Sequence, residues 1–287
     1  RKKREMINRD LFNAFLETSL KEDLGDGDQS SLACIPAEAT GSAKLLVKDE
    51  GIIAGLDITS LIFNRIDPAL KIEFYLRDGD RIKSGDTGFL VSGTIQSILK
   101  SERIVLNVLQ RMSGIATQTD RYVARIRDLH TKIRDTRKTT PGMRILDKEA
   151  VRIGGGENHR MGLYDMIMLK DNHIDFAGGI TKAIRKTNEY LESTGRGLRI
   201  EVEARGLEDV REILKAGGVH RIMLDNFSIA DTRRAVDLIA GQYETESSGK
   251  ITLENLREYA ECGVDYISVG ALTHQIKSLD LSLKASY

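Results

Sequence analysis

From about residue 131 onward the sequence repeats one unit, and this repetition limits the folds that the chain can adopt. Each unit has a short apolar segment of strand type, a polar loop and an amphipathic helix. The strand segments are TKIRDT, DMIMLK, LRIEVE, HRIMLD, QYETES and VDYISV, at residues 131–136, 165–170, 198–203, 220–225, 242–247 and 264–269. The helices expected between most of them are Thr181–Leu191, Leu207–Ala216, Ile229–Ile239 and Leu253–Cys262. Strands separated by helices pair in parallel with right-handed crossovers, which predicts an α/β architecture.

The carboxyl end of every strand segment carries charged residues, hydroxyl groups or glycine. In chain order these ends hold Arg137-Lys138, Lys170 with residues 171–173, Glu203, Asp225-Asn226, residues 246–249 and Gly270. In a barrel of parallel strands the active site gathers at the strand carboxyl ends and takes residues from several strands. An open doubly wound sheet would place its site at one switch point and use fewer strands. We therefore predict a TIM-like α/β barrel with a functional site at this rim.

The first third of the chain follows a different pattern. DLFNAFLETSL, residues 10–20, places apolar side chains on one helical stripe, and KIEFYL, residues 71–76, alternates as a half-buried strand. Residues 77–95 contain Asp-Gly and Gly-Asp pairs that mark tight reversals. A long helix should run from about Ser97 to Leu129, with a break near Ser113-Gly114. GDGDQSS, residues 25–31, lacks the spacing of a calcium loop and is expected to be a turn or helix cap.

These patterns give a domain prediction. Residues 7–112 should form an α+β domain on an antiparallel sheet, and residues 113–275 should form the barrel. Residues 276–287 should form a C-terminal helix that packs back toward the first domain. Met6 is a candidate native start.

Composition excludes several classes of partner. Lys+Arg and Asp+Glu both total 43, aromatic residues make up 5% and Trp is absent, so we expect no nucleic acid and no anionic membrane as ligand. No apolar run approaches the roughly 18 residues of a membrane span, and the basic start lacks the apolar region of a signal peptide. We expect a cytoplasmic protein in which Cys34 and Cys262 are free, buried thiols.

Basic residues gather at the predicted rim, namely Arg137, Lys138, His159, Arg160 and Lys170. Unpaired buried cations are costly, so this cluster indicates a substrate with several negative charges. Arg binds carboxylates bidentately, whereas Lys suits phosphate as a point charge. Glu203 and Asp225 form a smaller acidic pair, which would hold Mg²⁺ together with substrate phosphates or stabilise a cationic transition state.

Glycine-rich segments add a second indication. Residues 246–250, ESSGK, and residues 268–274, SVGALTH, each follow a strand and precede a helix, where backbone N–H groups can bind a phosphate. Residues 154–160, GGGENHR, fit neither the GxGxxG nor the Walker pattern. Their glycines would let the backbone pass close to a ligand or form a mobile flap.

Each of these signals has a structural alternative. Arg137-Lys138 could form a solvated turn, and a histidine such as His159 is often structural. Glu203 competes with Glu201 on the same face of its strand, and one of the two could simply pair with a cation of the rim. Asp225 could be a helix cap, although Ser228 is a second candidate for that position.

Residues 134–174, RDTRKTTPGMRILDKEAVRIGGGENHRMGLYDMIMLKDNHI, resemble the signature region of the quinolinate phosphoribosyltransferase family, also called nicotinate-nucleotide pyrophosphorylase (carboxylating). Further blocks are similar to this family: SERIVLNVLQRMSGIAT, IEVEARGLEDV, IMLDNF and ESSGKITLENLREYAECGVDYISVGALTH. The similarity covers nearly all of the chain from about Leu11 onward.

The resemblance implies an N-terminal α+β domain and a six- or seven-stranded α/β barrel, in a homodimer or a higher oligomer whose subunits share each active site. It also implies Mg²⁺-dependent transfer of phosphoribose from phosphoribosyl pyrophosphate (PRPP) to quinolinate. Loss of CO₂ would then give nicotinate mononucleotide and pyrophosphate, a step of NAD biosynthesis.

The resemblance also assigns roles to individual residues. The pyridine dicarboxylate would be held by Arg137, His159 and Arg160, and by Arg103 from the partner subunit. Lys138 and Lys170 would face the PRPP donor, and Glu203 and Asp225 would act near its ribose and its metal ion. These four are the implied catalytic residues. Phosphates would be bound by Ser248, Gly249, Gly270 and His274.

Three other functions stay open. A paralogous pyrophosphorylase acting on a different acid would share these motifs. A Schiff-base aldolase or lyase would use Lys170 or Lys138 as its nucleophile. A non-catalytic anion-binding barrel is disfavoured, because Glu203 and Asp225 would repel the ligand unless a metal ion were present.

Overall fold

The computed structural model describes residues 8–286, which fall into two compact units. Unit 1 comprises residues 8–120, 139–155 and 272–286, and unit 2 comprises residues 121–138 and 156–271. This division differs from the predicted domains, because residues 139–155 belong with the N-terminal part of the chain. The candidate start Met6 lies outside the described residues.

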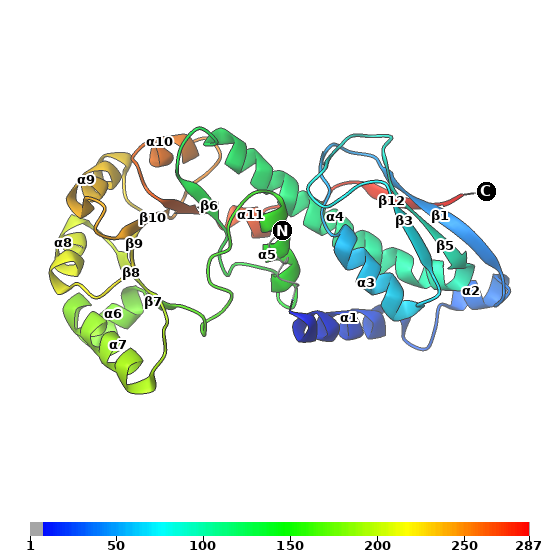
Figure 1. Cartoon of the computed structure of the whole chain (residues 1–287), viewed down its shortest axis with the longest axis horizontal. Coiled ribbons are helices and arrows are strands. Elements are labelled where there is room, and N and C mark those ends of the chain that lie inside the picture. The colour runs from blue at the N-terminus through cyan, green and yellow to red at the C-terminus, as the bar shows by residue number, and fades with distance from the viewer. Residues whose placement is uncertain (1–7, 287) are drawn as a thin grey trace. The chain divides into compact units, whose positions relative to one another are not determined.

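Unit 1 is built on a four-stranded antiparallel sheet with the order β12-β1-β5-β3. Its strands are β1 (Thr40–Val47), β3 (Lys71–Phe74), β5 (Thr87–Thr94) and β12 (Leu281–Ser286), and β2 (Gly51–Ile52) pairs separately with β4 (Arg81–Ile82). Its helices are α1 (Arg9–Leu24), α2 (Gln29–Cys34), α3 (Leu56–Ile66), most of α4 (Ile95–Arg125), α5 (Arg144–Ile153) and most of α11 (Ala271–His274) (Figure 1). Phe63 of α3 packs edge-on against Phe89 of β5 at 5.9 Å between ring centroids, which joins helix and sheet in one core.

Two local predictions in unit 1 have clear outcomes. The side chain of Asp28 accepts a hydrogen bond from the backbone N–H of Ser31 and caps α2, which confirms a helix cap in GDGDQSS. Both cysteines are free, but only Cys262 is buried. Cys34 is exposed at the end of α2, so the prediction of two buried thiols was wrong for it.

The predicted C-terminal helix was wrong. Residues Leu281–Ser286 form strand β12, which pairs antiparallel with β1 from Val47↔Leu281 to Ser42↔Ser286. The sequence LSLKAS has the period of two expected of a strand, with Leu281 and Leu283 buried. The chain end therefore returns to the N-terminal sheet by strand pairing rather than by helix packing.

The predicted break in the long helix was also wrong, because α4 is continuous. Ser113 and Gly114 serve tertiary contacts instead. The backbone N–H of Ala54 donates a hydrogen bond of 3.0 Å to Ser113 Oγ. A Cβ at position 114 would lie 2.4 Å from the carbonyl oxygen of Lys277, so glycine allows the C-terminal segment to approach the helix closely.

Unit 2 is a curved sheet of six parallel strands with helices on its outer side (Figure 1). The strands are β6 (Lys132–Arg134), β7 (Ile167–Leu169), β8 (Ile200–Ala204), β9 (Arg221–Asp225), β10 (Glu244–Ser248) and β11 (Tyr266–Ser268). The helices are α6 (Asp171–Ala177), α7 (Ile180–Thr194), α8 (Leu207–Ala216), α9 (Ile229–Ile239) and α10 (Leu256–Ala260). All six predicted strand segments are confirmed, and α8 and α9 have the predicted bounds.

The strand order β6-β11-β10-β9-β8-β7 places the first strand beside the last and keeps the others in sequence. This is the order of an α/β barrel, with β6 and β7 as the two end strands of the described sheet. The order brings the carboxyl ends of neighbouring strands to one rim. Among the described residues, no helix has the length and apolar character needed to cross a membrane.

Candidate active site

The first group at the rim of unit 2 joins β7, β8 and β9. Lys170 directly follows β7, and its Nζ lies 3.5 Å from Oε2 of Glu203 on β8. Leu169 pairs with Val202 in the sheet, so the residues that follow them, Lys170 and Glu203, lie side by side. Burial raises the pKa of Glu203, nearby Lys170 lowers it, and the charges of Asp225 and Asp171 raise it again. Glu203 therefore lies between a cation and a second carboxylate.

The second group joins β9 and β10. Asp225 is the register partner of Ser248, and the backbone N–H of Asn226 donates to the Ser248 carbonyl at 2.8 Å. Asn226 Nδ2 also donates to Asp225 Oδ2 at 2.7 Å. Gly249 has φ 90°, and a Cβ there would lie 2.4 Å from Asn226 Oδ1, so the turn after β10 requires glycine.

The helix-cap alternative for Asp225 was wrong. Ser228 is the N-cap of α9, and its Oγ accepts the backbone N–H of Asp231 at 3.1 Å. Asp225 is thus left at the rim beside Glu203, with a half-buried carboxylate that plays no part in capping α9.

A cationic group lies on the loops that follow β6. Arg137 and Arg160 are half-buried, and Lys138 is exposed. Burial lowers the pKa of Arg160, and electrostatic repulsion from the positive charge of Arg137 lowers it further. Arg160 Nη1 donates to the Met166 carbonyl at 3.3 Å. An anion between the two guanidinium groups would relieve this repulsion.

The residues after Lys138 are held by an aspartate that the sequence analysis missed. Asp147 of α5 is fully buried and makes two hydrogen bonds of 2.8 Å with Arg111 of α4. Its Oδ2 also accepts the backbone N–H of Thr140 at 3.2 Å. Arg144 Nε donates to Thr139 Oγ1 at 3.0 Å. The loop is therefore ordered by specific bonds, which argues against a plain solvated turn.

The triple-glycine segment leads to His159. A Cβ at Gly154 would lie 2.4 Å from the carbonyl oxygen of Ala116, so close backbone approach is confirmed, but toward α4 rather than a ligand. Glu157 then forms a bridge with Arg134 of β6. Asp135 accepts the backbone N–H of His159 at 2.8 Å. Backbone bonds to β6 hold this segment, which does not support the alternative of a mobile flap.

The remaining predicted residues are placed by the end of β11 and by unit 1. Gly270 follows β11 and is half-buried. Arg103 is exposed on α4, and His274 is exposed at the end of α11. Both belong to unit 1, whereas the other predicted site residues all belong to unit 2.

A buried ionic cluster lies beneath the rim, and only two of its members, His159 and Glu201, were singled out from the sequence. We call it the interior cluster, and its members are Arg134, His159, Glu201, Arg221, Glu246 and Tyr266. The register pairs Glu201 with Arg221 and Glu246 with Tyr266, so these side chains share the inner face of the sheet. Charged residues at every second position of IEVEA and ETESS were the available signal. The inner face of a barrel is usually filled by branched apolar side chains, and that expectation hid the signal.

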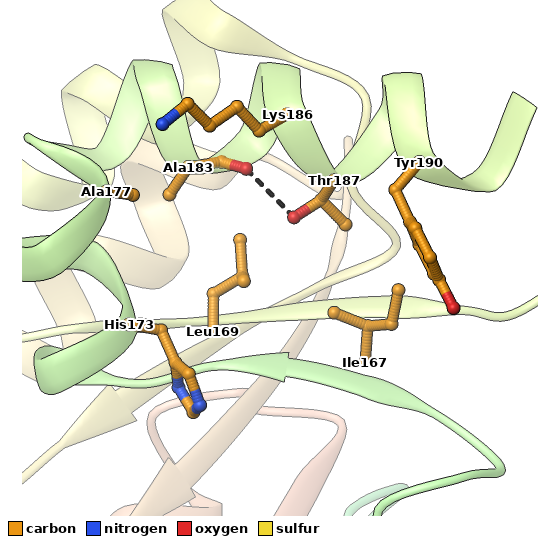
Figure 2. A pocket seen from close by; sticks show the side chains of 8 residues that line it. All are labelled: Ile167, Leu169, His173, Ala177, Ala183, Lys186, Thr187 and Tyr190. Carbon is orange, nitrogen blue, oxygen red and sulfur yellow. Dashed lines mark hydrogen bonds between the residues drawn. The ribbon is translucent and has the colours of Figure 1, made fainter. Parts of the chain in front are cut away.

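An apolar pocket lies on the side of β7 that faces helix α7 (Figure 2). It has a volume of about 200 Å³ and lies between Ile167 and Leu169 of β7 and residues such as Thr187 and Tyr190 of α7. None of the predicted site residues lines it. Its apolar lining does not suit a substrate with several negative charges.

Family models match both parts of the chain. Residues 28–113 match the model described as quinolinate phosphoribosyl transferase, N-terminal domain, and residues 115–284 match the model of the C-terminal domain. The chain belongs to the quinolinate phosphoribosyltransferase family. The resemblance inferred from the signature region is confirmed.

Named relatives of this quinolinate phosphoribosyltransferase family member span most of its length. It is 44% identical over 284 residues to quinolinate phosphoribosyltransferase [decarboxylating] 2, mitochondrial, from Nicotiana glauca, covering 94% of this chain and 80% of the relative. It is also 44% identical over 262 residues to a probable nicotinate-nucleotide pyrophosphorylase [carboxylating] from Bacillus subtilis, covering 91% of this chain and 89% of the relative.

A solved structure, NadC from Streptococcus pyogenes, is similar to the whole fold. Its TM-score is 0.92 at 38% identity, and the match covers 99% of this chain and 100% of that one. This similarity confirms the predicted fold class, an antiparallel α+β part and a parallel α/β part with six strands.

Proposed function

We propose that the chain transfers the phosphoribosyl group of PRPP to quinolinate and that the product then loses CO₂. The observation that carries the proposal is the match of both family models, from residue 28 to residue 284 with one residue between them. The relatives are named as decarboxylating or carboxylating enzymes, which are the two directions of one reaction that makes or breaks a bond to CO₂. The products are nicotinate mononucleotide, pyrophosphate and CO₂.

The acceptor site is assigned to the cationic group. Quinolinate carries two carboxylates on neighbouring ring carbons, and the two half-buried arginines Arg137 and Arg160 repel each other enough for Arg137 to lower the pKa of Arg160. Each guanidinium can bind a carboxylate through two parallel hydrogen bonds. Binding of the dianion converts the repulsion between the arginines into attraction and orients the ring nitrogen toward the donor.

The donor site is assigned to the rim from β7 to β10. Lys170 and Lys138 bind phosphate groups of PRPP through their positive charge, and the turn at Ser248 and Gly249 offers backbone N–H groups to a phosphate. As pyrophosphate leaves with the electron pair of the C1′–O bond, positive charge develops on the ribose. The carboxylates of Glu203 and Asp225 stabilise that charge. The ring nitrogen of quinolinate then forms the new bond to C1′.

Decarboxylation follows from the charge on the alkylated ring. The C–C bond to the carboxylate beside the nitrogen breaks, CO₂ departs and the electron pair remains on the ring carbon. The adjacent pyridinium nitrogen stabilises this carbanion until a proton replaces CO₂. No covalent nucleophile from the protein is needed, so Lys170 acts by its charge rather than as a Schiff base.

Mg²⁺ is the proposed metal ion, and the acidic pair at the rim fits it. Glu203 Oε2 is buried and has no hydrogen-bond donor within the described residues, although Lys170 Nζ lies 3.5 Å away. Mg²⁺ is usually held by one or two carboxylates together with substrate phosphates. Glu203 and Asp225 would hold it, and it would neutralise charge on the leaving pyrophosphate. Chelation with EDTA should abolish turnover, and added Mg²⁺ should restore it.

We also propose a homodimer in which Arg103 of one subunit completes the acceptor site of the other, and in which His274 meets a phosphate. Their exposure is compatible with these roles. A cytoplasmic location stays a prediction from the sequence, and cell fractionation tests it, since relatives from Nicotiana glauca and Arabidopsis thaliana are named mitochondrial and chloroplastic.

The deciding experiment is incubation with PRPP, Mg²⁺ and quinolinate labelled at the carboxylate beside the ring nitrogen. We expect CO₂ and pyrophosphate to be released in equal amounts, and no transfer when nicotinate replaces quinolinate. Transfer to nicotinate without CO₂ would favour the paralogous pyrophosphorylase. Borohydride trapping of Lys170 with a carbonyl substrate would favour the aldolase.

A further inference from the structure

His159 lies between the cationic group and the interior cluster. Its Nε2 is 2.9 Å from Glu201 Oε2 and 3.4 Å from Glu246 Oε1. Its Nδ1 is 2.7 Å from the backbone nitrogen of Arg160, which donates its hydrogen. The imidazole is therefore clamped between buried carboxylates on one side and the turn that carries Arg160 on the other.

The charges around the ring balance when both acids are ionised. Arg221 Nη1 lies 3.4 Å from Glu201 Oε2 and 3.2 Å from Glu246 Oε2, and Arg134 Nη1 lies 3.6 Å from Glu246 Oε2. Both guanidinium groups lie over the ring of Tyr266, at 3.3 Å for Arg134 and 4.5 Å for Arg221. Two anions and two cations leave no requirement for a charged imidazole.

Further ionisable groups border this cluster. Glu157 pairs with Arg134, and Glu244 pairs with Arg221 and with Arg199. These outer acids pair with the two arginines and add to the negative charge around the cluster.

A metal ion is the obvious rival occupant. Single ligand atoms of His159, Glu201 and Glu246 lie within 4.8 Å of one another, and all three residues are buried. Arg221 Nη1 already lies within 3.4 Å of both carboxylates, however, and a guanidinium repels a divalent cation. Hydrogen bonding, not metal binding, explains this arrangement of the three side chains.

The hydrogen bonds identify the tautomer of His159. Because Nδ1 accepts the backbone N–H of Arg160, Nδ1 carries no proton. The proton of a neutral ring is then on Nε2, where Glu201 accepts it. A charged ring would place an N–H group against the N–H of Arg160. A ring nitrogen of His159 reaches a substrate only by giving up one of these two bonds.

We propose that Glu201 and Glu246 are positioning residues for the acceptor site: they hold His159 with its proton on Nε2, so that Nδ1 binds the backbone of Arg160 and sets the turn that presents its guanidinium to a substrate carboxylate. The inference rests on the proposed role of Arg160 in quinolinate binding. Neither glutamate touches the reacting atoms, and both act through His159.

The variant Glu201→Gln tests the proposal, with Glu244→Gln as the matched control. Both remove one carboxylate from Arg221, but Glu201 bonds His159, whereas Glu244 bonds Arg221 and Arg199. The amide introduced by Glu201→Gln can turn its NH₂ group toward the ring and no longer fixes the tautomer. We expect the KM for quinolinate to rise by about tenfold or more, as for loss of a hydrogen bond to a charged group. The KM for PRPP should stay within about twofold of the wild-type value, because the turn that carries Arg160 is proposed to bind quinolinate and not PRPP. An unchanged KM for quinolinate, or an equal rise in the control, would overturn the proposal.

Nitrogen NMR of the wild-type protein gives a second test that does not depend on the stability of a variant. With ¹⁵N-labelled histidine at pH 8, the His159 signals, assigned by their loss in His159→Asn, should show a protonated Nε2 and an unprotonated Nδ1. A proton on Nδ1 would refute the inference. Failure of the wild-type protein to release CO₂ would instead refute the proposed function, and the tautomer would still be read independently.

Discussion

Arg137 and Lys138 stand next to each other in the chain but differ in their surroundings. Arg137 is half-buried and its charge lowers the pKa of Arg160, whereas Lys138 is exposed and its backbone N–H donates to Thr136 Oγ1 at 3.0 Å. Two planar guanidinium groups suit a dicarboxylate, because each can bind one carboxylate, whereas an exposed ammonium group suits a phosphate. We therefore propose that Arg137 serves the acceptor and Lys138 the donor.

This assignment predicts separable kinetic effects. Arg137→Ala should lower kcat/KM for quinolinate by at least about 100-fold, since a hydrogen bond to a charged group contributes about 1.5–3 kcal/mol and the proposed bidentate contact has two of them. Lys138→Ala should act mainly on the KM for PRPP. Steady-state kinetics in both substrates measures this, and both variants should keep the wild-type melting temperature.

Lys215→Ala is a suitable control, because Lys215 is exposed on the last turn of α8. Its kinetics should match the wild type. If Arg137→Ala and Lys138→Ala also retained wild-type activity, the cationic group would not be the acceptor and donor site.

At the level of elements, the interior cluster ties together β6, β8, β9, β10 and β11. Its two acids are fully buried, and burial raises the pKa of Glu201 and of Glu246 to about 7. An acid whose pKa is raised by folding stabilises the folded state at low pH, where it is protonated. The stabilisation is complete below the unfolded value, near 4.5, and is lost as the pH rises through 7.

Glu246→Gln should therefore change the pH dependence of stability, because a glutamine keeps the shape of the protonated acid. Relative to the wild type, the variant should gain unfolding free energy between pH 5 and pH 8, on the order of 1–3 kcal/mol. Urea denaturation across this range measures the difference. A constant or decreasing difference would mean that Glu246 is ionised throughout.

Helix α4 contains Gly114, although glycine has a low helix propensity. Alanine at an exposed position of a helix is better than glycine by about 1 kcal/mol. At position 114, however, a Cβ would meet the Lys277 carbonyl at 2.4 Å. Gly114→Ala should thus destabilise the protein by about 2 kcal/mol or more through overpacking, measured by thermal denaturation.

Gly197→Ala is the matched control, since no atom lies within 4 Å of a Cβ at that position. Its effect should stay within about 0.5 kcal/mol, the usual range for surface changes. A stabilising effect of Gly114→Ala would show that the C-terminal segment does not pack on α4 in solution.

At the level of the whole molecule, the proposed sharing of active sites between two subunits can be tested by mixing variants. Arg103 belongs to unit 1, and the acceptor arginines belong to unit 2. If Arg103 serves the partner subunit, a dimer of one Arg103→Ala chain and one Arg137→Ala chain contains one intact site. Each variant alone should be inactive.

Random mixing of the two inactive variants should restore about a quarter of the wild-type activity, because half of the dimers are mixed and each has one intact site of two. Activity measured after co-expression or after unfolding and refolding together tests this. Absence of recovery, with mixed dimers demonstrated by differently tagged chains, would mean that each subunit owns a complete site.

The amino-acid sequence was enough to predict the six parallel strands, most of their helices and which polar side chains lie at the strand ends. Strand and helix periods, helix caps such as Asp28 and glycine turns act over a few residues, so they can be read locally. Residues at strand carboxyl ends, such as Glu203 and Asp225, follow directly from the parallel arrangement. The signature region supplied the family, which local periodicity could not.

Contacts between segments far apart in the chain could not be predicted from the sequence and are known from the folded structure. Residues 281–286 suit a strand, but β1, their partner, lies more than 200 residues earlier, and local pattern does not reveal such pairing. Glu201, Glu246 and Arg221 have the alternating positions of inner-face residues, yet their bonds to His159 depend on strand order and register. A buried charge is tolerated only where an opposite charge lies close to it, and in this cluster the partners come from strands that are far apart in the sequence.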